Sequence, residues 1–234
     1  EEFVGWVQGL VELGASNFEL RSKSYRAVRD FLREQIAKQR ADPGDNYISR
    51  LLASEIDGEP VPDIVILNMC MLILVAGVDT TWSTIGSSLW HFASHPKDRQ
   101  RLVAEPELLS SAVEEMLRLH APASAGRVAM KDMDHDGHRI KRGERMILSF
   151  PAANRDPAVF ECPDEADIGR EKNRHVAFGV GIHRCAGSNL ARLEMEVALG
   201  VWFARIPEFE LSDPDAVTWS AGQVRGARTV PVTF

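Results

Sequence analysis

The chain has 234 residues, 44% of them hydrophobic and 26% charged, with a formal net charge of −7. These values suit a soluble globular protein of one domain or two small ones. The acidic balance disfavours a general role in binding nucleic acid or anionic membranes. The three cysteines are an odd number without a CxxC pair, so neither a disulfide framework nor a structural zinc site is indicated.

Helical periodicity dominates the first half of the chain. An amphipathic pattern predicts a helix over residues 18–38, ended by the sequence ADPGDN, and a short helix follows at 47–53. Asp63 is then the predicted cap of a long helix that continues to about Ser94. Its apolar stretch, residues 64–77, has a length that favours a buried core helix over a membrane span.

The second half of the chain changes from helical to strand-like patterns. Two more helices are predicted, over residues 96–104 and 106–119. They are followed by short strands at 126–130, 138–150 and 228–234, an ordered loop over 151–175 and a final amphipathic helix over 188–204. The predicted fold class is therefore mainly α with small β-sheets (α+β).

One cysteine lies in an unusual sequence, FGVGIHRCAG, which ends just before the final helix. Peptide N–H groups and the positive end of a helix dipole both stabilise a thiolate at Cys185. Gly179, Gly181 and Gly187 let the backbone approach a large flat ligand. A dinucleotide site is disfavoured because the GxGxxG pattern would need glycine at 184, and a zinc site because His183 and Cys185 have no companion pair. A glycine-rich turn around a structural cysteine stays open at this point.

This segment resembles the haem-binding signature of the cytochrome P-450 superfamily, FxxGxxxCxG. The resemblance implies that Cys185 is the thiolate ligand of the iron in haem b, and the only metal ligand expected from this chain. It further implies that Phe178, Gly179 and Gly187 frame the cofactor. By the same resemblance, His183 hydrogen-bonds a haem propionate.

The long predicted helix carries a second motif, AGVDTT, at residues 76–81. A buried acid beside a threonine is costly there without a purpose. The Thr80 hydroxyl can bond the Ala76 carbonyl and bend the helix, and Gly77 weakens the same turn. The motif resembles the distal sequence AGxDTT of the same superfamily, which implies that Thr80 holds dioxygen and its waters while Asp79 relays protons. The alternative is a capped kink with an ion-paired Asp79.

Several arginines and one glutamate complete the resemblance. Glu115 and Arg118 lie three residues apart on one helix face, where the ordinary interpretation is a surface pair. They match the ExxR motif of the superfamily, which implies a buried network with Arg170. Arg127 matches the residue that pairs with a haem propionate, a role that suits a bidentate guanidinium.

Two weaker expectations concern the substrate and the electron donor. By resemblance, residues 123–126 and 219–223 line the substrate pocket. Between 169 and 192 the basic side chains outnumber the acidic ones, which predicts a surface that steers an acidic donor, with a solvated face as the alternative. The basic residues of this stretch are Arg170, Lys172, Arg174, Arg184 and Arg192.

The resemblance covers the whole chain, from roughly the second third of a family member to its C-terminus, and the sequence opens without Met. Residues 1–234 are therefore expected to be a partial cytochrome P-450 domain that holds haem poorly alone. The resemblance implies a cytoplasmic haem-thiolate monooxygenase that hydroxylates a small hydrophobic substrate with dioxygen and two electrons from a ferredoxin-type donor. No nucleic acid and no membrane segment is expected. A peroxide-using haem-thiolate enzyme and a non-catalytic or truncated haem-binding protein remain as alternatives.

Overall fold

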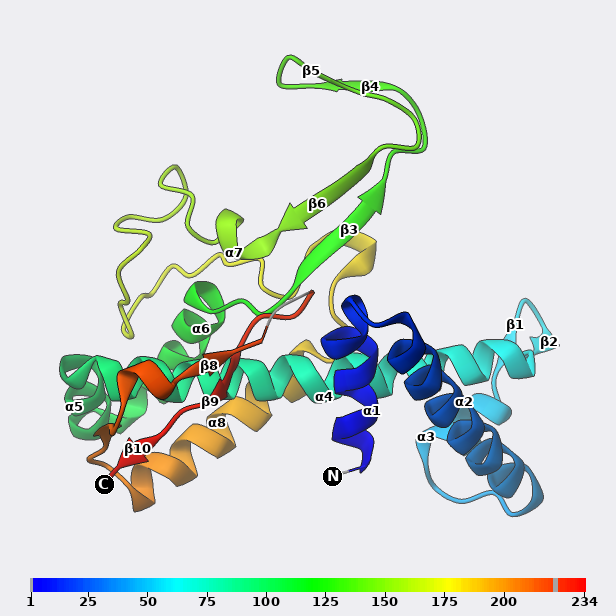
Figure 1. Ribbon diagram of the computed structural model, residues 1–234, viewed down its shortest axis with the longest axis horizontal. Helices are drawn as coiled ribbons and strands as arrows, with labels where there is room; N and C mark the ends of the chain where they lie inside the picture. Colours follow the sequence, from blue (N-terminus) through cyan, green and yellow to red (C-terminus); the bar gives the residue numbers. More distant parts are fainter. Residues whose placement is uncertain (1, 221–222) are drawn as a thin grey trace. The chain divides into compact units, whose positions relative to one another are not determined.

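The computed structural model describes residues 2–220 and 223–234, which form mainly helices with small two-stranded sheets (Figure 1). The α+β class expected from the sequence is confirmed. The chain divides into two compact units, Glu1–Asp79 and Thr80–Phe234. The boundary falls inside one helix, α4 (Asp63–Ser94), so the two parts of that helix belong to different units.

The first unit is helical. Its elements are α1 (Glu2–Val11), η1 (Leu13–Ala15), α2 (Phe18–Ala41), α3 (Tyr47–Leu52) and the beginning of α4. The side chain of Asn17 accepts the Leu20 N–H at 3.0 Å and so caps α2. The core of this unit joins one face of α2 to the first turns of α4; its buried members include Val28, Leu32, Ile36, Ile66, Leu67 and Cys70.

A small hairpin in the first unit was not predicted. β1 (Glu55–Ile56) pairs antiparallel with β2 (Glu59–Pro60). The turn between them holds Asp57 at φ 54° and Gly58 at φ 83°. Asp-Gly is the dipeptide that this left-handed turn geometry favours, so the signal was present in the sequence.

Helix α4 has the predicted extent, Asp63–Ser94. Asp63 is its first helical residue, and the Asp63 carboxylate pairs with Arg40 of α2, whereas a capping role was expected. By length and composition alone α4 could cross a membrane, with 22% of its most apolar window buried. The apolar stretch over residues 64–77 was expected to be buried, but only Ile66, Leu67 and Cys70 in it are buried. The second half of α4 carries buried polar side chains; these are Asp79, Ser83, Thr84, Ser87, Ser88 and His91.

The second unit packs helices around one apolar core. Its main helices are the end of α4, α5 (Pro96–Ala104), α6 (Leu109–Leu119) and α8 (Ser188–Arg205), with shorter turns at η2 (Pro106–Leu108), α7 (Phe150–Ala153), η3 (Gly181–His183) and η4 (Pro214–Ala216). Met116 of α6 and Leu199 of α8 have no exposed surface and belong to this core with Phe92 of α4. The contact between α6 and α8 fixes the cysteine segment, because that segment leads directly into α8.

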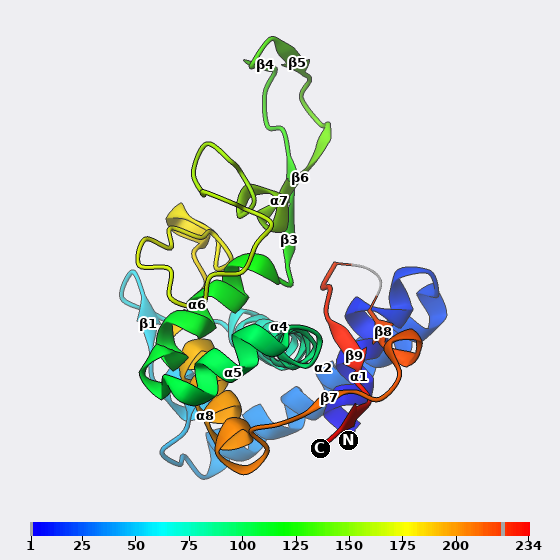
Figure 2. The same ribbon diagram turned by 90° about the vertical axis from the view of Figure 1, so that its left-hand side faces the viewer.

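The second unit also contains antiparallel strand pairs. β3 (Ser124–Val128) pairs with β6 (Arg145–Ser149), with Gly126 opposite Ile147. The chain between β3 and β6 forms a projecting hairpin of β4 (Met133–His135) and β5 (His138–Ile140), visible in both views (Figures 1 and 2). Towards the C-terminus β7 (Glu210–Leu211) pairs with β10 (Val232–Thr233), and β8 (Thr218–Trp219) pairs with β9 (Ala227–Thr229).

Strand β9 is joined to α4 by hydroxyl groups. The Ser87 hydroxyl donates to the Ser83 carbonyl at 2.7 Å and accepts the Ala227 N–H at 3.2 Å. Arg228 donates to the Ser83 hydroxyl at 2.8 Å. A Cβ atom at Gly86 would lie 2.7 Å from the Ala227 carbonyl oxygen, so glycine is needed for this close approach.

Candidate functional site

The cysteine segment is a tight turn that exposes one thiol. Gly179 and Gly181 both have φ +67°, a conformation that side-chain-bearing residues rarely adopt. The Cys185 N–H donates to the Phe178 carbonyl at 2.8 Å and closes the loop. Helix α8 begins at Ser188, so the cysteine precedes a helix N-terminus, as predicted from the sequence.

The surface around Cys185 is apolar and open. The cysteine is a free thiol and exposed. Val180 is 66% exposed and Ile182 is 97% exposed, and a Cβ atom at Gly181 would meet nothing within 4 Å. Large aliphatic side chains in water cost free energy, so this face suits contact with a large apolar group.

The predicted ExxR residues form a buried network. Arg118 donates to both oxygens of Glu115, at 2.9 and 2.7 Å, and Arg170 donates to the same carboxylate at 3.1 Å. Burial alone would raise the pKa of Glu115, but the hydrogen bonds from Arg118 and from the Asp167 N–H hold it below its usual value. The surface-pair interpretation is therefore wrong and the expected network with Arg170 is present.

Sequence reasoning missed the partners that complete this network. Arg118 also donates to three backbone carbonyls, those of Asn154, Pro163 and Glu165, at 2.9, 2.6 and 2.9 Å. Asn173 donates to Glu115 at 3.0 Å. The buried ion pair thus ties the loop over residues 151–175 to α6, in addition to the backbone hydrogen bonds within the loop. No spacing pattern in the sequence could have named these carbonyls.

Two predicted propionate partners lie on different elements. Arg127 is on β3, where its guanidinium donates to the Gly126 carbonyl at 2.8 Å. Within the described residues it has no ion-pair partner. His183 ends the η3 turn before Cys185 and is exposed. Both side chains are therefore available to an anionic group.

The AGVDTT motif lies at the boundary between the two units. Ala76, Gly77 and Asp79 belong to the first unit and Thr80 to the second. Asp79 is 1% exposed, whereas Ala76 and Gly77 are exposed, and a Cβ atom at Gly77 would meet nothing within 4 Å. The Thr80 carbonyl accepts the Thr84 hydroxyl at 2.9 Å. The expected bond from Thr80 to Ala76 and the place of this motif opposite Cys185 stay predictions.

The two stretches expected to line a substrate pocket are brought together. Ala123 forms an isolated antiparallel bridge with Val224, and the Arg225 N–H donates to the Pro122 carbonyl at 2.7 Å. Residues 221 and 222 of the second stretch lie outside the described residues. Trp219 packs edge-on against Trp90 of α4, with ring centroids 5.1 Å apart.

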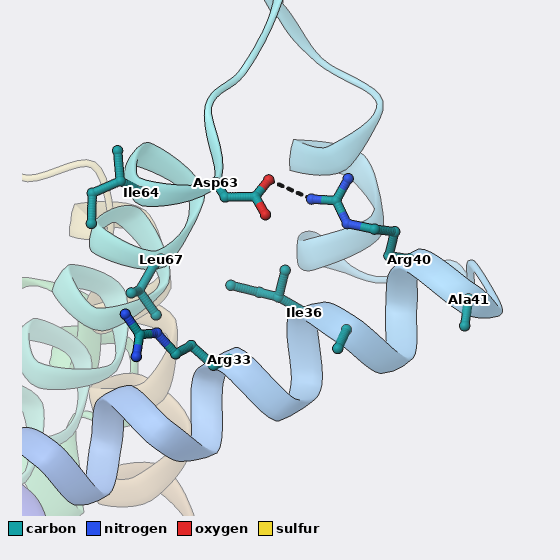
Figure 3. Close-up of a pocket in the computed structure, with 8 residues that line it drawn as sticks. Arg33, Ile36, Arg40, Ala41, Asp63, Ile64 and Leu67 are labelled. Atoms are coloured by element: carbon teal, nitrogen blue, oxygen red, sulfur yellow. Dashed lines mark hydrogen bonds and ion pairs between the residues drawn. The ribbon is translucent and has the colours of Figure 1, made fainter.

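A cavity of about 650 Å³ in the first unit lies between α2 and the start of α4 (Figure 3). Its lining is partly aliphatic, with Ile36 and Leu67 from opposite helices, and partly charged, with Arg40 and Asp63 joined across its edge (Figure 3). None of the predicted site residues lines it. It therefore adds no support to any role expected from the sequence.

A histidine cluster in the second unit was not predicted. His91 and His95 stack with ring centroids 4.2 Å apart, and His91 Nε2 lies 2.8 Å from Asp98 Oδ2. They border a cavity of about 580 Å³ that His120 also lines. Burial, with a smaller contribution from the positive charge of Arg155, lowers the pKa of His120 to about 3, so its ring is neutral. Among the described residues no group of His, Cys, Asp and Glu is arranged to hold a metal ion.

The basic stretch is less charged than the sequence suggested. Arg170 belongs to the Glu115 network, and Arg192 pairs with Glu114, with Nη2 to Oε2 at 3.1 Å. Lys172, Arg174 and Arg184 are exposed and have no ion-pair partner within the described part of the chain. Three free cations remain of the five counted in the sequence.

An exposed cysteine just before a helix and a buried Glu-Arg network are the features expected of a haem-thiolate protein. The family model for Cytochrome P-450 matches residues 15–215, and the chain belongs to this family. It is 36% identical to "Polyketide biosynthesis cytochrome P-450 PksS" of Bacillus subtilis over 100% of this chain and 58% of that protein. It is also 36% identical to "Steroid C26-monooxygenase" of Mycobacterium tuberculosis, over 99% and 64%. It is 37% identical to "Vitamin D(3) 25-hydroxylase" of Pseudonocardia autotrophica, over 100% and 59%.

Solved structures are similar over nearly the whole chain. The PksS structure superposes with a TM-score of 0.91 at 36% identity, covering 97% of this chain and 60% of that one. A Bacillus megaterium structure, CYP109E1 in complex with testosterone, gives 0.92 at 29% identity, covering 99% and 62%. The chain thus spans about three-fifths of the length of the relatives it matches.

Haem b, the cofactor of this family, fits the residues present. The exposed Cys185 sulfur, the open backbone at Gly181 and the apolar surface of Val180 and Ile182 suit a flat apolar macrocycle with a central metal. Arg127 and His183 would bind its carboxylates. Cys185 would hold the iron.

Proposed function

We propose that the full protein is a haem-thiolate monooxygenase that hydroxylates a small hydrophobic organic molecule with dioxygen and two electrons. The observation that carries this proposal is the exposed Cys185 thiol in a loop closed by its own N–H bond to Phe178 and set before α8. A thiolate-bound haem supplies the activation of dioxygen. The relatives named for steroid and vitamin D(3) hydroxylation support a hydrophobic substrate.

In this proposal protons are delivered by two residues of α4, Asp79 and Thr80. Asp79 is a buried acid, and the neighbouring Thr80 has a hydroxyl that can pass a proton onward. In this proposal Asp79 takes protons from solvent and Thr80 hands them to the oxygen being reduced. The small residues Ala76 and Gly77 leave space for that oxygen and for water.

Electrons reach the site from a ferredoxin-type protein in this proposal. The exposed cations Lys172, Arg174 and Arg184 lie in or beside the cysteine segment, and a ferredoxin is an acidic partner that such a surface would attract. We further propose that the protein is cytoplasmic, because three free cysteines suit a reducing compartment. The two units would then be parts of one cytochrome P-450 domain.

The test is the carbon monoxide difference spectrum of the reduced, full-length protein. A thiolate-type red shift is expected in the unchanged protein and should be lost in Cys185→Ser, whereas Cys162→Ser, which removes another exposed cysteine, should keep it. Absence of the shift in the unchanged protein would overturn the proposal. Product formation driven by reduced ferredoxin, and not by added peroxide alone, separates the monooxygenase from a peroxide-using enzyme.

A further inference from the structure

Glu114 of α6 holds two side chains from the cysteine side of the second unit. Arg192 of α8 donates to both of its oxygens, with Nε to Oε1 at 2.5 Å and Nη2 to Oε2 at 3.1 Å. His175 Nε2 lies 3.0 Å from Oε2. The other nitrogen of that ring, Nδ1, accepts the Ala177 N–H at 3.2 Å, so a neutral ring donates from Nε2 to Glu114.

Arg192 connects this carboxylate to the cysteine loop. Its guanidinium carbon lies 4.5 Å from the centroid of the Phe178 ring, within cation–π range. The carbonyl of the same Phe178 accepts the Cys185 N–H at 2.8 Å. Arg192 also donates to the Ser188 carbonyl at 3.4 Å, in the first turn of α8. The guanidinium therefore lies against the residue that closes the loop and against the helix that follows it.

Both members of the pair stay charged. Burial alone would raise the pKa of Glu114, but the hydrogen bonds from His175 and Arg192 and the charge of Arg192 lower it to about 2. The hydrogen bond with Glu114 raises the pKa of Arg192, burial opposes this, and the charge of Glu114 raises it further. The pair therefore places a fixed positive and a fixed negative charge next to the cysteine loop, because Arg192 contacts the Phe178 ring.

We propose that Glu114 and Arg192 are positioning residues that fix the charge next to the loop carrying Cys185 and thereby set the reduction potential of a haem bound at that cysteine. This inference rests on the proposed function. A positive charge near the sulfur weakens the thiolate's donation to iron and favours the ferrous state. Glu114 both holds Arg192 in place and partly cancels its charge.

Substitutions of Arg192 and of Glu114 should therefore shift the reduction potential in opposite directions. Removing the positive charge in Arg192→Leu should lower the potential, because the thiolate becomes a stronger donor. Removing the negative charge in Glu114→Gln should raise the reduction potential, because the positive charge of Arg192 is then no longer partly cancelled. A purely structural role predicts the same sign for both, since loosening the loop exposes the haem to water in either variant.

The experiment is a spectroelectrochemical titration of the haem-loaded full-length protein. We expect each variant to change the ferric–ferrous equilibrium constant at least threefold in its own direction, which is about 28 mV at 59 mV per tenfold. Arg192→Lys should keep the potential, and Arg192→Gln serves as a second neutral variant should the leucine variant fail to fold. Arg205→Leu is the matched control on the same helix, about 20 Å farther along.

The outcomes separate this inference from the proposed function. A normal thiolate-type carbon monoxide spectrum, with potentials that do not move or that move in one direction in both variants, overturns the inference alone. A thiolate-type spectrum missing from the unchanged protein overturns both. Opposite shifts, with Arg205→Leu unchanged, support the assignment of Glu114 and Arg192.

Discussion

Arg118 and Glu115 share two hydrogen bonds, at 2.9 and 2.7 Å, and neither side chain has any exposed surface. A buried charge left without its partner is far costlier than an exposed one. Because Arg118 also satisfies three carbonyls of the 151–175 loop, its removal would leave those acceptors unpaired as well. The pair therefore ties helix α6 to the loop that leads into the cysteine segment.

Arg118→Leu is expected to lower the free energy of unfolding by roughly 3–5 kcal/mol. Urea unfolding followed by circular dichroism measures this. The matched control is Glu105→Gln, which breaks the exposed Arg101–Glu105 pair at 3.5 Å and should cost less than about 1 kcal/mol. Equal effects of the two substitutions would contradict a structural role for the buried network.

Glu114 predicts an acid-sensitive contribution to stability. Its pKa in the folded protein, about 2, lies below the usual 4.5. The stabilisation is therefore fully present above pH 4.5 and is lost as the pH falls towards 2, because the unfolded state then binds the proton more tightly. After solvent screening we expect about 2 kcal/mol.

Unfolding curves of the unchanged protein and of Glu114→Gln between pH 7 and pH 3 measure this contribution. The difference in free energy between them should shrink as the pH falls, since the unchanged carboxylate becomes protonated. A difference that stays constant across this range would show that Glu114 does not depend on its charge. Glu194→Gln on α8 supplies an exposed control.

The close approach of Gly226 to Ser83 of α4 can be tested by adding a side chain at position 226. A Cβ atom there would lie 2.3 Å from the Ser83 Cβ and 2.6 Å from the Ser83 Cα, so Gly226→Ala must displace backbone. We expect a loss of roughly 1–3 kcal/mol of unfolding free energy. Gly126→Ala is the control, because a Cβ at Gly126 meets nothing within 4 Å. Thermal melts that rank the two variants in the reverse order would refute the contact.

Substitution of Thr80 is expected to reduce the coupling of electron consumption to product formation without loss of haem. If its hydroxyl passes protons, Thr80→Ala should keep the carbon monoxide spectrum but form less product for each electron consumed. The ratio of product to reduced donor consumed measures this in the full-length protein. Thr81→Ala, one residue along the same helix, is the comparison. Unchanged coupling in the Thr80 variant would remove the proton-relay role.

The elements with strong periodicity were predictable. Helix α4 has the predicted bounds, and α5 begins at Pro96 and ends at Ala104 as expected. The first helix, α1, was not predicted. The hairpins at Asp57-Gly58 and Asp136-Gly137 were missed too, although both turns carry the Asp-Gly pair that favours positive φ. Short strands contain too few residues to show an alternating pattern, which is why only turn chemistry could reveal them.

The site was predictable where a motif carried it and not where distant residues met. The bond between Glu115 and Arg170 was expected from the family pattern and is present. The partnership of Arg192 with Glu114 was not, because the two residues lie far apart in sequence and join only when α6 packs on α8. Arg192 was therefore counted as a free cation. Glu114 neutralises the charge of Arg192 because α6 packs on α8, and the spacing of residues in the sequence does not reveal that contact.

The hydrogen bond from the Ala227 N–H to the Ser87 hydroxyl attaches the C-terminal strand β9 to α4, a helix far away in the sequence. The Ser87 hydroxyl donates its hydrogen to its own helix, and its oxygen accepts the amide N–H of the strand. Proteolysis near the C-terminus would release β9 from α4 and admit water between the strand and the helix. Limited digestion near the C-terminus should thus loosen α4 at Ser83 and Ser87, far from the severed bond in sequence.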